Sequence, residues 1–254
     1  DVFDAPFTNQ GIVRALEANQ GTAFNAAFLN AEGASFTVEV INSSLVTLNA
    51  TDVVNAGLIT ITGGSGAASY SSELSIPNGT LVNTGTIRST TGARAGSRTL
   101  RGDVDNQGTI AAVNQNLNYS GAFTLTADAS GVFQVNDGRV ISLNSGTMTV
   151  LGSGTTFVET ATGRVNVAGN LTMASDFTLP LTGPAMDMSF DNVTTVSGPG
   201  RFINADTLYT DRDVFDAPFT NQGIVRALEA NQGTAFNAAF LNAEGASFTV
   251  EVIN

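Results

Sequence analysis

The 254-residue chain contains no cysteine, histidine, tryptophan or lysine, so all ten of its basic residues are arginines. Without histidine or cysteine there is no imidazole base, no thiolate nucleophile and no zinc held by such ligands. Without lysine there is no Schiff base and no P-loop lysine. These absences exclude much catalytic chemistry, and the sequence predicts a protein that is not an enzyme and has no cofactor.

Charged residues are also scarce. They make up 13% of the chain, and 22 acidic against 10 basic groups give a net charge of −12. Nucleic acids and anionic membranes bind clustered cations, so neither is expected as a partner. No apolar run approaches the roughly 18 residues of a membrane span, so direct membrane insertion is not expected. Hydrophobic residues, at 42%, are enough for a folded core.

Residues 213–254 repeat residues 1–42 without one change, which sets a period of 212 residues (213 − 1). The sequence therefore divides into one full repeat, 1–212, and the start of a second, 213–254. Such identity indicates recent duplication, homogenisation of a tandem array or deliberate engineering. The second copy stops in a strand-like run whose first copy continues, so we expect the chain to be part of a longer array. The junction, 201–223, has no Gly/Ser or proline-rich spacer, so we expect the two copies to stack continuously.

A shorter motif, apolar-x-Asn-x-Gly-x-apolar, recurs within the period. Its polar pairs are Asn9 and Gly11, Asn55 and Gly57, Asn83 and Gly85, Asn106 and Gly108, and Asn221 and Gly223. Glycines of the strict and relaxed copies, at 11, 33, 57, 85, 108 and 131, are 22, 24, 28, 23 and 23 residues apart. Every second side chain of a strand points the same way, so the apolar and Asn positions face inward together. Glycine permits the backbone angles of the corner that follows.

This spacing predicts an all-β, right-handed parallel β-solenoid with about 23 residues per coil and about nine coils per 212-residue period. The handedness follows from the general chirality of parallel crossovers. At roughly 4.8 Å per coil, a period should advance on the order of 43 Å along the axis. Equivalent asparagines would then stack, and their amides would hydrogen-bond along the axis, which offsets the cost of burying them.

Two stretches fit this pattern less well. Residues 12–33 are rich in Ala, Leu, Glu and Gln and are compatible with a helix. Phe24, Ala26, Phe28 and Asn30 alternate within them, so we expect strands there. Residues 179–200 hold three of the six prolines and no copy of the motif. We expect them to form a loop or an irregular coil.

The recurring NQG-I, NAG-L, NTG-T-I and NQG-T-I sequences resemble those of secreted β-helical proteins of Gram-negative bacteria. These include autotransporter passenger domains, filamentous-haemagglutinin-type exoproteins and giant repeat adhesins. The resemblance covers most of the chain, but its motifs identify an architecture better than a protein. It implies export through the outer membrane and a rod-like stalk that bears adhesive domains elsewhere. The 212-residue superrepeat departs from the commonest form of the family and is closer to a giant tandem-array fibre.

On this basis we expect a structural repeat unit of a long extracellular fibre or adhesin stalk on a bacterial surface. Its partners would be neighbouring identical repeats and, laterally, other fibres or surface glycans. The competing interpretation is a β-helical protein that binds or cleaves carbohydrate. Asp187 and Asp191 would then be the paired carboxylates of a glycosidase. Neither has an arginine close by in the sequence, and there is no tryptophan for sugar stacking.

Four arginines, Arg88, Arg94, Arg98 and Arg101, fall within one stretch in a chain otherwise poor in cations. The Gly, Ser and Thr residues around them predict a projecting loop between two coils. Planar guanidinium groups suit an anionic glycan or the acidic surface of a neighbouring rod. The alternative is a solvated loop that only lowers self-repulsion.

Acidic residues gather at the repeat junction, where Asp211, Asp213 and Asp216 follow Asp206. Several carboxylates within a short segment can hold Ca²⁺ through their oxygen atoms. Asp211, Asp213 and Asp216 are therefore the candidate ligands of a metal site. A solvated acidic edge is the alternative interpretation.

Overall fold

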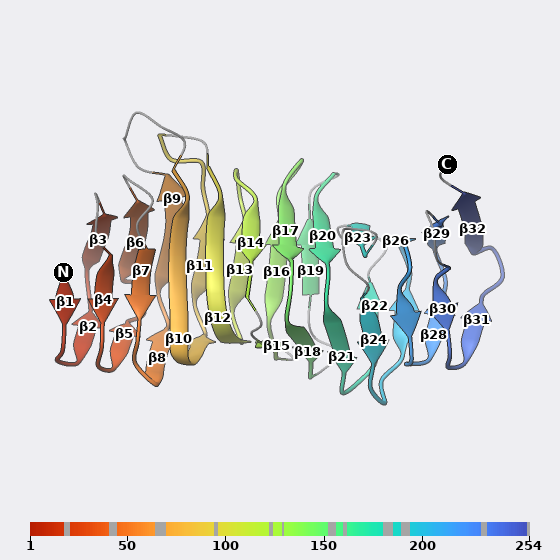
Figure 1. Cartoon of the computed structure of the whole chain (residues 1–254), viewed down its shortest axis with the longest axis horizontal. Coiled ribbons are helices and arrows are strands. Elements are labelled where there is room, and N and C mark those ends of the chain that lie inside the picture. Colours follow the sequence, from red (N-terminus) through yellow and green to blue (C-terminus); the bar gives the residue numbers. More distant parts are fainter. Residues whose placement is uncertain are drawn as a thin grey trace.

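Strands that coil around one long axis make up the described part of the chain. The computed structural model describes residues 1–17, 21–40, 45–63, 70–93, 96–121, 124–128, 130–151, 156–159, 162–179, 185–188, 194–229 and 233–252. Within these ranges every regular secondary-structure element is a β-strand. No helix long and apolar enough to cross a membrane is found among the described residues. The strands stack into a rod with the N-terminus at one end and the C-terminus at the other (Figure 1).

Each coil lays strands on three sides of the rod, and strands of successive coils pair in parallel along each side. Side 1 carries β1 (Val2–Phe3), β4 (Thr22–Phe24), β7 (Leu45–Leu48), the first parts of β10 (Ser72–Asn83) and β12 (Arg98–Asn106), β14 (Leu117–Tyr119), β17 (Val140–Leu143), β20 (Arg164–Val167), β23 (Ala185–Asp187), β26 (Thr207–Thr210), β29 (Ile224–Glu229) and β32 (Ser247–Val252). Side 2 carries β2 (Phe7–Asn9), β5 (Phe28–Asn30), β8 (Asp52–Asn55), the second parts of β10 and β12, β15 (Thr124–Ala127), β18 (Thr147–Val150), β21 (Asn170–Met173), β24 (Thr195–Ser197), β27 (Val214–Phe215) and β30 (Ala235–Phe236).

Side 3 carries two sheets in succession. The first contains β3 (Ile12–Glu17), β6 (Ser35–Val40), β9 (Leu58–Gly63), β11 (Thr86–Ser89), β13 (Thr109–Ala112), β16 (Val132–Val135) and β19 (Thr156–Glu159). The second contains β22 (Phe177–Leu179), β25 (Phe202–Asn204), β28 (Phe219–Asn221) and β31 (Phe240–Asn242).

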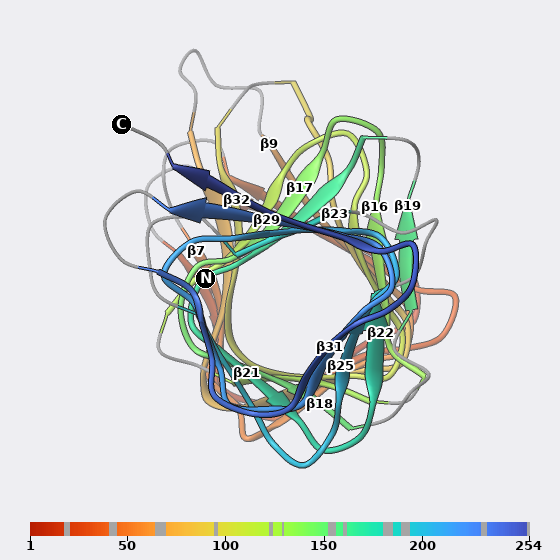
Figure 2. The ribbon, with the colours of Figure 1, turned by 90° about the vertical axis from the view of Figure 1, so that its right-hand side faces the viewer.

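The order of the strands around the axis makes the solenoid right-handed. In the view from the C-terminal end, the chain passes from β31 at the lower right up to β32, which runs leftward across the top (Figure 2). It therefore turns anticlockwise as it approaches the viewer. The prediction of an all-β, right-handed parallel β-solenoid is confirmed.

The strand pairings also give the length of the period in coils. On side 2, nine successive pairings lead from β2 through β5, β8, β10, β12, β15, β18, β21 and β24 to β27. β27 repeats the sequence of β1, which precedes β2 by one side. The 212-residue period therefore takes nine and one-third coils, or about 23 residues per coil. The prediction of about nine coils per period is confirmed.

One column of inward-facing side chains forms the core. In β6, Phe36 and Val38 are fully buried, while Thr37 between them lies at the surface side of the sheet. In β10, Leu81 and Asn83 are both fully buried. Each large apolar side chain buried in this way contributes roughly 1.5–3 kcal/mol.

The glycine of the motif is required by the closeness of stacked corners. A Cβ atom on Gly57 would lie 2.3 Å from the carbonyl oxygen of Ala31, and one on Gly85 would lie 2.1 Å from that of Gly57. Neither glycine has a positive φ. Glycine is therefore required at these corners because the coil below touches the backbone. The unusual backbone angles expected from the sequence are not the reason.

The structure decides both of the doubtful stretches. Residues 12–33 contain the strands β3, β4 and β5, as expected, and no helix in their described part. The expectation of a loop or irregular coil for 179–200 is wrong for β23 and β24, which pair within sides 1 and 2. Met186, Met188 and Val196 are fully buried there. A coil needs inward apolar residues at the right spacing, but it does not need the Asn-x-Gly corner.

Candidate functional site: the repeat junction

The two copies of the 42-residue sequence have the same internal structure. In the first copy β1 pairs with β4, β2 with β5 and β3 with β6. In the second copy β27 pairs with β30, β28 with β31 and β29 with β32, in the same registers. Each copy therefore provides the same two stacked coils, and only their surroundings differ.

The second copy is seated directly on the end of the first repeat. β27 pairs with β24, β28 with β25 and β29 with β26. Inside the rod, Phe202 is the partner of Phe219 and Leu208 the partner of Val225. Residues 194–229 are described without a gap, and all three sides continue through the junction.

Phenylalanine rings carry the core across this junction. The ring of Phe202 lies 5.6 Å from that of Phe219 in a stacked arrangement and 6.1 Å from that of Phe215 edge-on. Phe177, one coil earlier, lies 5.2 Å from Phe202. Aromatic pairs at such separations contribute about 0.5–1.5 kcal/mol beyond the area that they bury.

In the described part of the chain no coil lies beneath the first copy, and its apolar side chains are open there. Phe3 is 39% exposed, whereas its counterpart Phe215 is 0% exposed. The open end has a hollow of about 320 Å³, lined by Phe3, Phe7, Val13, Ala15 and Phe24 among others. We call it the N-terminal hollow. In the second copy, the coil that holds Val196, Phe202 and Leu208 lies at the corresponding position.

Asparagine side chains form two ladders in the core. In the first ladder each Nδ2 atom donates to the Oδ1 atom of the next asparagine at 2.7–2.8 Å, in the order Asn9, Asn30, Asn55, Asn83 and Asn106. Each Nδ2 also donates to a backbone carbonyl of the next coil, as Asn30 does to Leu58. These asparagines are 0–3% exposed. A buried amide is costly unless it is paired, and the ladder pairs it.

The second ladder begins just before the junction and crosses it. Asn204 donates to Asn221 at 2.9 Å, and Asn221 donates to Asn242 at 2.7 Å. Leu179 is the partner of Asn204 in the coil below, and the ladder therefore starts at Asn204. This ladder follows side 3, whereas the first follows side 2. The sequence analysis missed Asn204, because its motif, FINAD, lacks the glycine.

The carboxyl group of Asp213 is completely buried at the junction. Its Oδ1 atom accepts a hydrogen bond from the backbone N–H of Thr194 at 2.8 Å, and Oδ2 accepts one from the N–H of Asp211 at 3.0 Å. The residue is 0% exposed, and this burial raises the pKa of Asp213 to about 8. The nearby carboxylate of Asp211 adds to the rise. The two backbone hydrogen bonds act in the opposite direction but do not cancel it.

These acidic residues do not assemble as metal ligands. The carboxylate of Asp211 forms an ion pair with Arg212 at 3.4 Å, and Asp216 accepts a hydrogen bond from Asn237 at an exposed corner. In the described part of the chain no three acidic side chains lie close enough to hold a metal ion. The arrangement gives no support to the Ca²⁺ site considered from the sequence.

Of the four clustered arginines, the three that lie within the described residues do not form a common surface. Arg98 is 0% exposed, and its guanidinium donates to the backbone carbonyl groups of Thr90, Thr91, Gly96 and Ser97 at 2.7–3.1 Å. Its burial lowers the pKa of Arg98. This side chain closes the turn between β11 and β12 from inside and is not available to a ligand.

The other arginines of the group have different surroundings. Arg101 forms an ion pair with Glu73 at 3.0 Å, and Arg88 donates to the hydroxyl of Thr60 at 3.1 Å. Arg88 lies on side 3 and Arg101 on side 1, so they point away from the rod in different directions. Arg94 lies outside the described residues.

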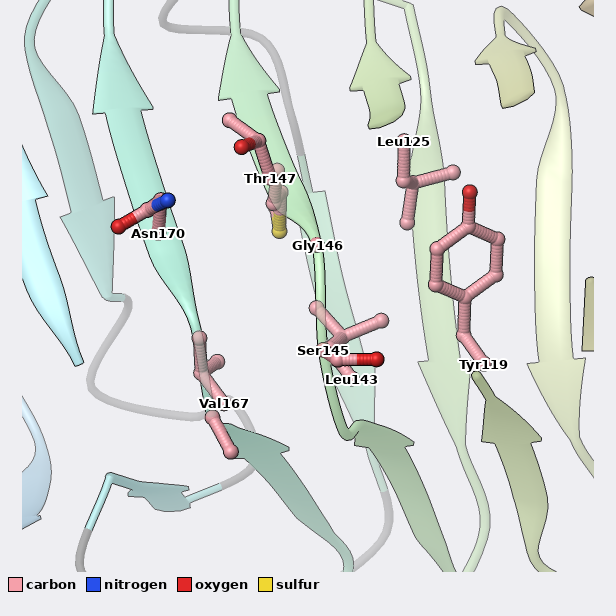
Figure 3. Close-up of a pocket in the computed structure, with 10 residues that line it drawn as sticks. Tyr119, Leu125, Leu143, Ser145, Gly146, Thr147, Val167 and Asn170 are labelled. Carbon is pink, nitrogen blue, oxygen red and sulfur yellow. The ribbon is translucent and has the colours of Figure 1, made fainter. Parts of the chain in front are cut away.

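Of the two carboxylates considered for carbohydrate cleavage, Asp187 and Asp191, the structure describes only Asp187. Asp187 is 3% exposed and forms an ion pair with Arg164 at 3.4 Å, while Asp191 lies outside the described residues. Arg164 is far from Asp187 in the sequence, but the two residues lie on paired strands one coil apart. The expected lack of an arginine near Asp187 therefore does not hold in space. A small pocket lies where sides 1 and 2 meet, between β14, β17 and β20 on one side and β15, β18 and β21 on the other, and most of the side chains that line it are apolar, Tyr119 among them (Figure 3). Its volume of about 10 Å³ is that of a single water molecule at most.

Comparison with known proteins yields no relative from which a function could be transferred. No protein-family model, no curated protein and no solved structure matches the chain. Its function is therefore inferred from its own residues and geometry.

Proposed function

We propose that the chain is a segment of a long, non-catalytic fibre built from identical 212-residue repeats. One observation carries this proposal: the second copy is seated on the first repeat through ladders that continue on all three sides. It thereby buries Phe215, whose counterpart Phe3 is exposed at the free end. The same contact, made by each added repeat, lengthens the rod without any new interface.

The proposed setting is the bacterial surface, with the fibre as an extracellular stalk. It is supported by the resemblance of the Asn-x-Gly motifs to those of secreted β-helical proteins. Antibodies against the repeat should label intact cells of the source bacterium, and external protease should remove the label. Labelling only after the cells are opened would contradict this setting.

The fibre itself is tested by the length of tandem arrays. Nine and one-third coils at roughly 4.8 Å each advance about 45 Å, so each added period should lengthen the rod by about that amount. Small-angle scattering or electron microscopy of arrays with one, two and three periods would measure this increment. Straight rods that grow linearly are expected. Independent domains would instead give flexible beads, whose mean length grows less than linearly.

Carbohydrate chemistry has no comparable support among the described residues. The arginines Arg88, Arg98 and Arg101 have separate structural partners, and Asp187 is paired with Arg164. The apolar pocket around Tyr119 is too small for a sugar ring. We therefore propose a structural role.

A further inference from the structure

The period of the repeat does not contain a whole number of coils. The first strand of the first copy, β1, lies on side 1, but its counterpart β27 lies on side 2. Likewise β3 lies on side 3 and its counterpart β29 on side 1. Each new repeat therefore begins one side later than the previous one. In an untwisted solenoid, successive repeats would face three different directions.

The solenoid is twisted, however, and its sides turn around the axis along the rod. Seen from the C-terminal end, side 3 moves from the top at β9 through the upper right at β16 and β19 to the lower right at β22, β25 and β31 (Figure 2). Side 1 moves from the left at β7 to the top at β29 and β32. The right-handed twist of each strand rotates neighbouring strands relative to one another, and such rotations accumulate along a stack.

The two effects have opposite senses. Over one period, the twist carries side 1 to the position that side 3 occupied at the start. The second copy begins one side late, so its strands return to the original direction. β9 stacks on β6 and lies at the top of the view in Figure 2. β32, the counterpart of β6 in the second copy, also lies at the top. In the side view β3, β6, β29 and β32 all lie in the upper half, and β5 and β31 in the lower half (Figure 1).

We infer that the 212-residue period is matched to the twist, so that successive repeats of the fibre face the same direction. This inference rests on the proposed function, since it concerns tandem arrays. The additional third of a coil offsets the twist that nine coils accumulate. The fibre is therefore one-sided: each surface feature recurs along one line, about 45 Å apart at roughly 4.8 Å per coil.

One feature that such an array would align is a patch of hydroxyl groups on side 2. Thr124 and Thr126 in β15 stack on Thr147 and Thr149 in β18. The column continues through Thr172. A one-sided fibre presents this patch once per repeat to any extended partner that lies along it, and the contacts then add through multivalency. A fibre whose repeats rotated would offer the same partner only one repeat in three.

The orientation can be measured directly because the chain contains no cysteine. Thr80 is exposed on side 2, and Ala93 is exposed at the turn between β11 and β12 in the same coil. A three-repeat array would carry Thr80→Cys in every repeat, with a small gold particle on each thiol. A matched control would carry Thr80→Cys in the outer repeats and Ala93→Cys in the middle one. Both arrays would be imaged by electron microscopy.

In the first array the three particles should lie along the same edge of the rod, about 45 Å apart by the roughly 4.8 Å rise per coil. In the control the middle particle should lie on the other edge, which shows that the method separates the two positions. Particles of the first array that wind around a straight rod would overturn the inference while leaving the fibre intact. An array that bends freely between repeats would overturn the proposed function and the inference together.

Discussion

The first and last 42 residues can be compared directly, because the same sequence lies in two different environments. The first copy is covered only by the coil above it, and the second only by the coil below it. As a result Phe215 is buried, whereas its counterpart Phe3 is 39% exposed. Conversely Phe240 is 41% exposed, whereas its counterpart Phe28 is 2% exposed. Strand register is the same in both copies. The fold of a coil is therefore set by its own sequence, whereas its burial is set by its neighbours.

This comparison predicts where substitutions should matter. A change in the second copy that disturbs contacts with the preceding coil should destabilise the protein. The same change in the first copy should have a smaller effect, because nothing lies beneath it.

The buried carboxyl group of Asp213 should make stability depend on pH. Its counterpart Asp1 is exposed, but burial raises the pKa of Asp213 from an ordinary value of 3.8 to about 8. The folded protein therefore holds a proton that the unfolded chain releases between pH 4 and pH 8. The contribution of Asp213 to stability should be greatest below pH 4, fall across this window and level off above pH 8. The difference between the two pKa values corresponds to roughly 6 kcal/mol.

Urea unfolding at pH 4, 6 and 8 would measure this slope. Asp213→Asn should flatten it, since an amide does not titrate. Asp216→Asn, at an exposed corner, is the matched control and should leave the slope in place. Asp206, whose pKa is also raised by burial, contributes in the same direction and should account for part of what remains. An unchanged slope in Asp213→Asn would show that the junction does not bury a protonated carboxyl group.

Phe215→Ala should cost about 3–5 kcal/mol, because it removes a fully buried ring and leaves a cavity. Phe3→Ala removes the same side chain from the open end, where the ring stacks on Phe24 at 4.7 Å but is partly in water. It should cost about 1–2 kcal/mol. Unfolding in denaturant, followed by far-ultraviolet circular dichroism, would give both values. Equal losses would mean that the second copy is not seated as described.

The main features of the fold could be predicted from the sequence, because the motif is local and periodic. Glycines about 23 residues apart set the coil length, and alternation around Asn55 or Asn83 identified the buried faces. The registers of β23 and β24 could not be predicted, because Met186 and Val196 carry no corner motif. The separate surroundings of the arginines could not be predicted either. Arg98 is buried inside a closed turn, and Arg101 forms an ion pair with Glu73, which is 28 positions away in the sequence.

The junction shows the same limit. The duplication, and the absence of a spacer in 201–223, predicted that the second copy would stack directly on the first. The change of side was not predictable, because small differences in coil length add up only over the whole period. The burial of Asp213 was likewise hidden, since a cluster of aspartates in sequence indicates a solvated or metal-binding edge. Such burial depends on the backbone N–H groups of Thr194 and Asp211.

The second asparagine ladder should be more sensitive than the start of the first. Asn221→Ala removes the acceptor of Asn204 and the donor to Asn242, and it should cost about 2–3 kcal/mol. Asn9→Ala removes one donor to Asn30 from the first rung, which has no asparagine beneath it, and should cost about 1–2 kcal/mol. Thermal unfolding of the two variants would rank them. The reverse ranking would contradict a ladder that crosses the junction.

The smallest change tests the comparison most directly. A Cβ atom on Gly223 would lie 2.2 Å from the carbonyl oxygen of Asp206, whereas one on Gly11 meets nothing within 4 Å. Gly223→Ala should therefore cost about 1–3 kcal/mol, since the backbone of one corner must shift. Gly11→Ala should be nearly neutral in this chain. When a complete repeat is added before residue 1, Gly11 acquires the surroundings of Gly223, and the same substitution should then cost as much as Gly223→Ala. Urea unfolding of the three variants, with the two unsubstituted parents, would measure this. If Gly11→Ala stayed neutral in the longer chain, the added repeat would not cover the N-terminal hollow, and repeats would not stack into one rod.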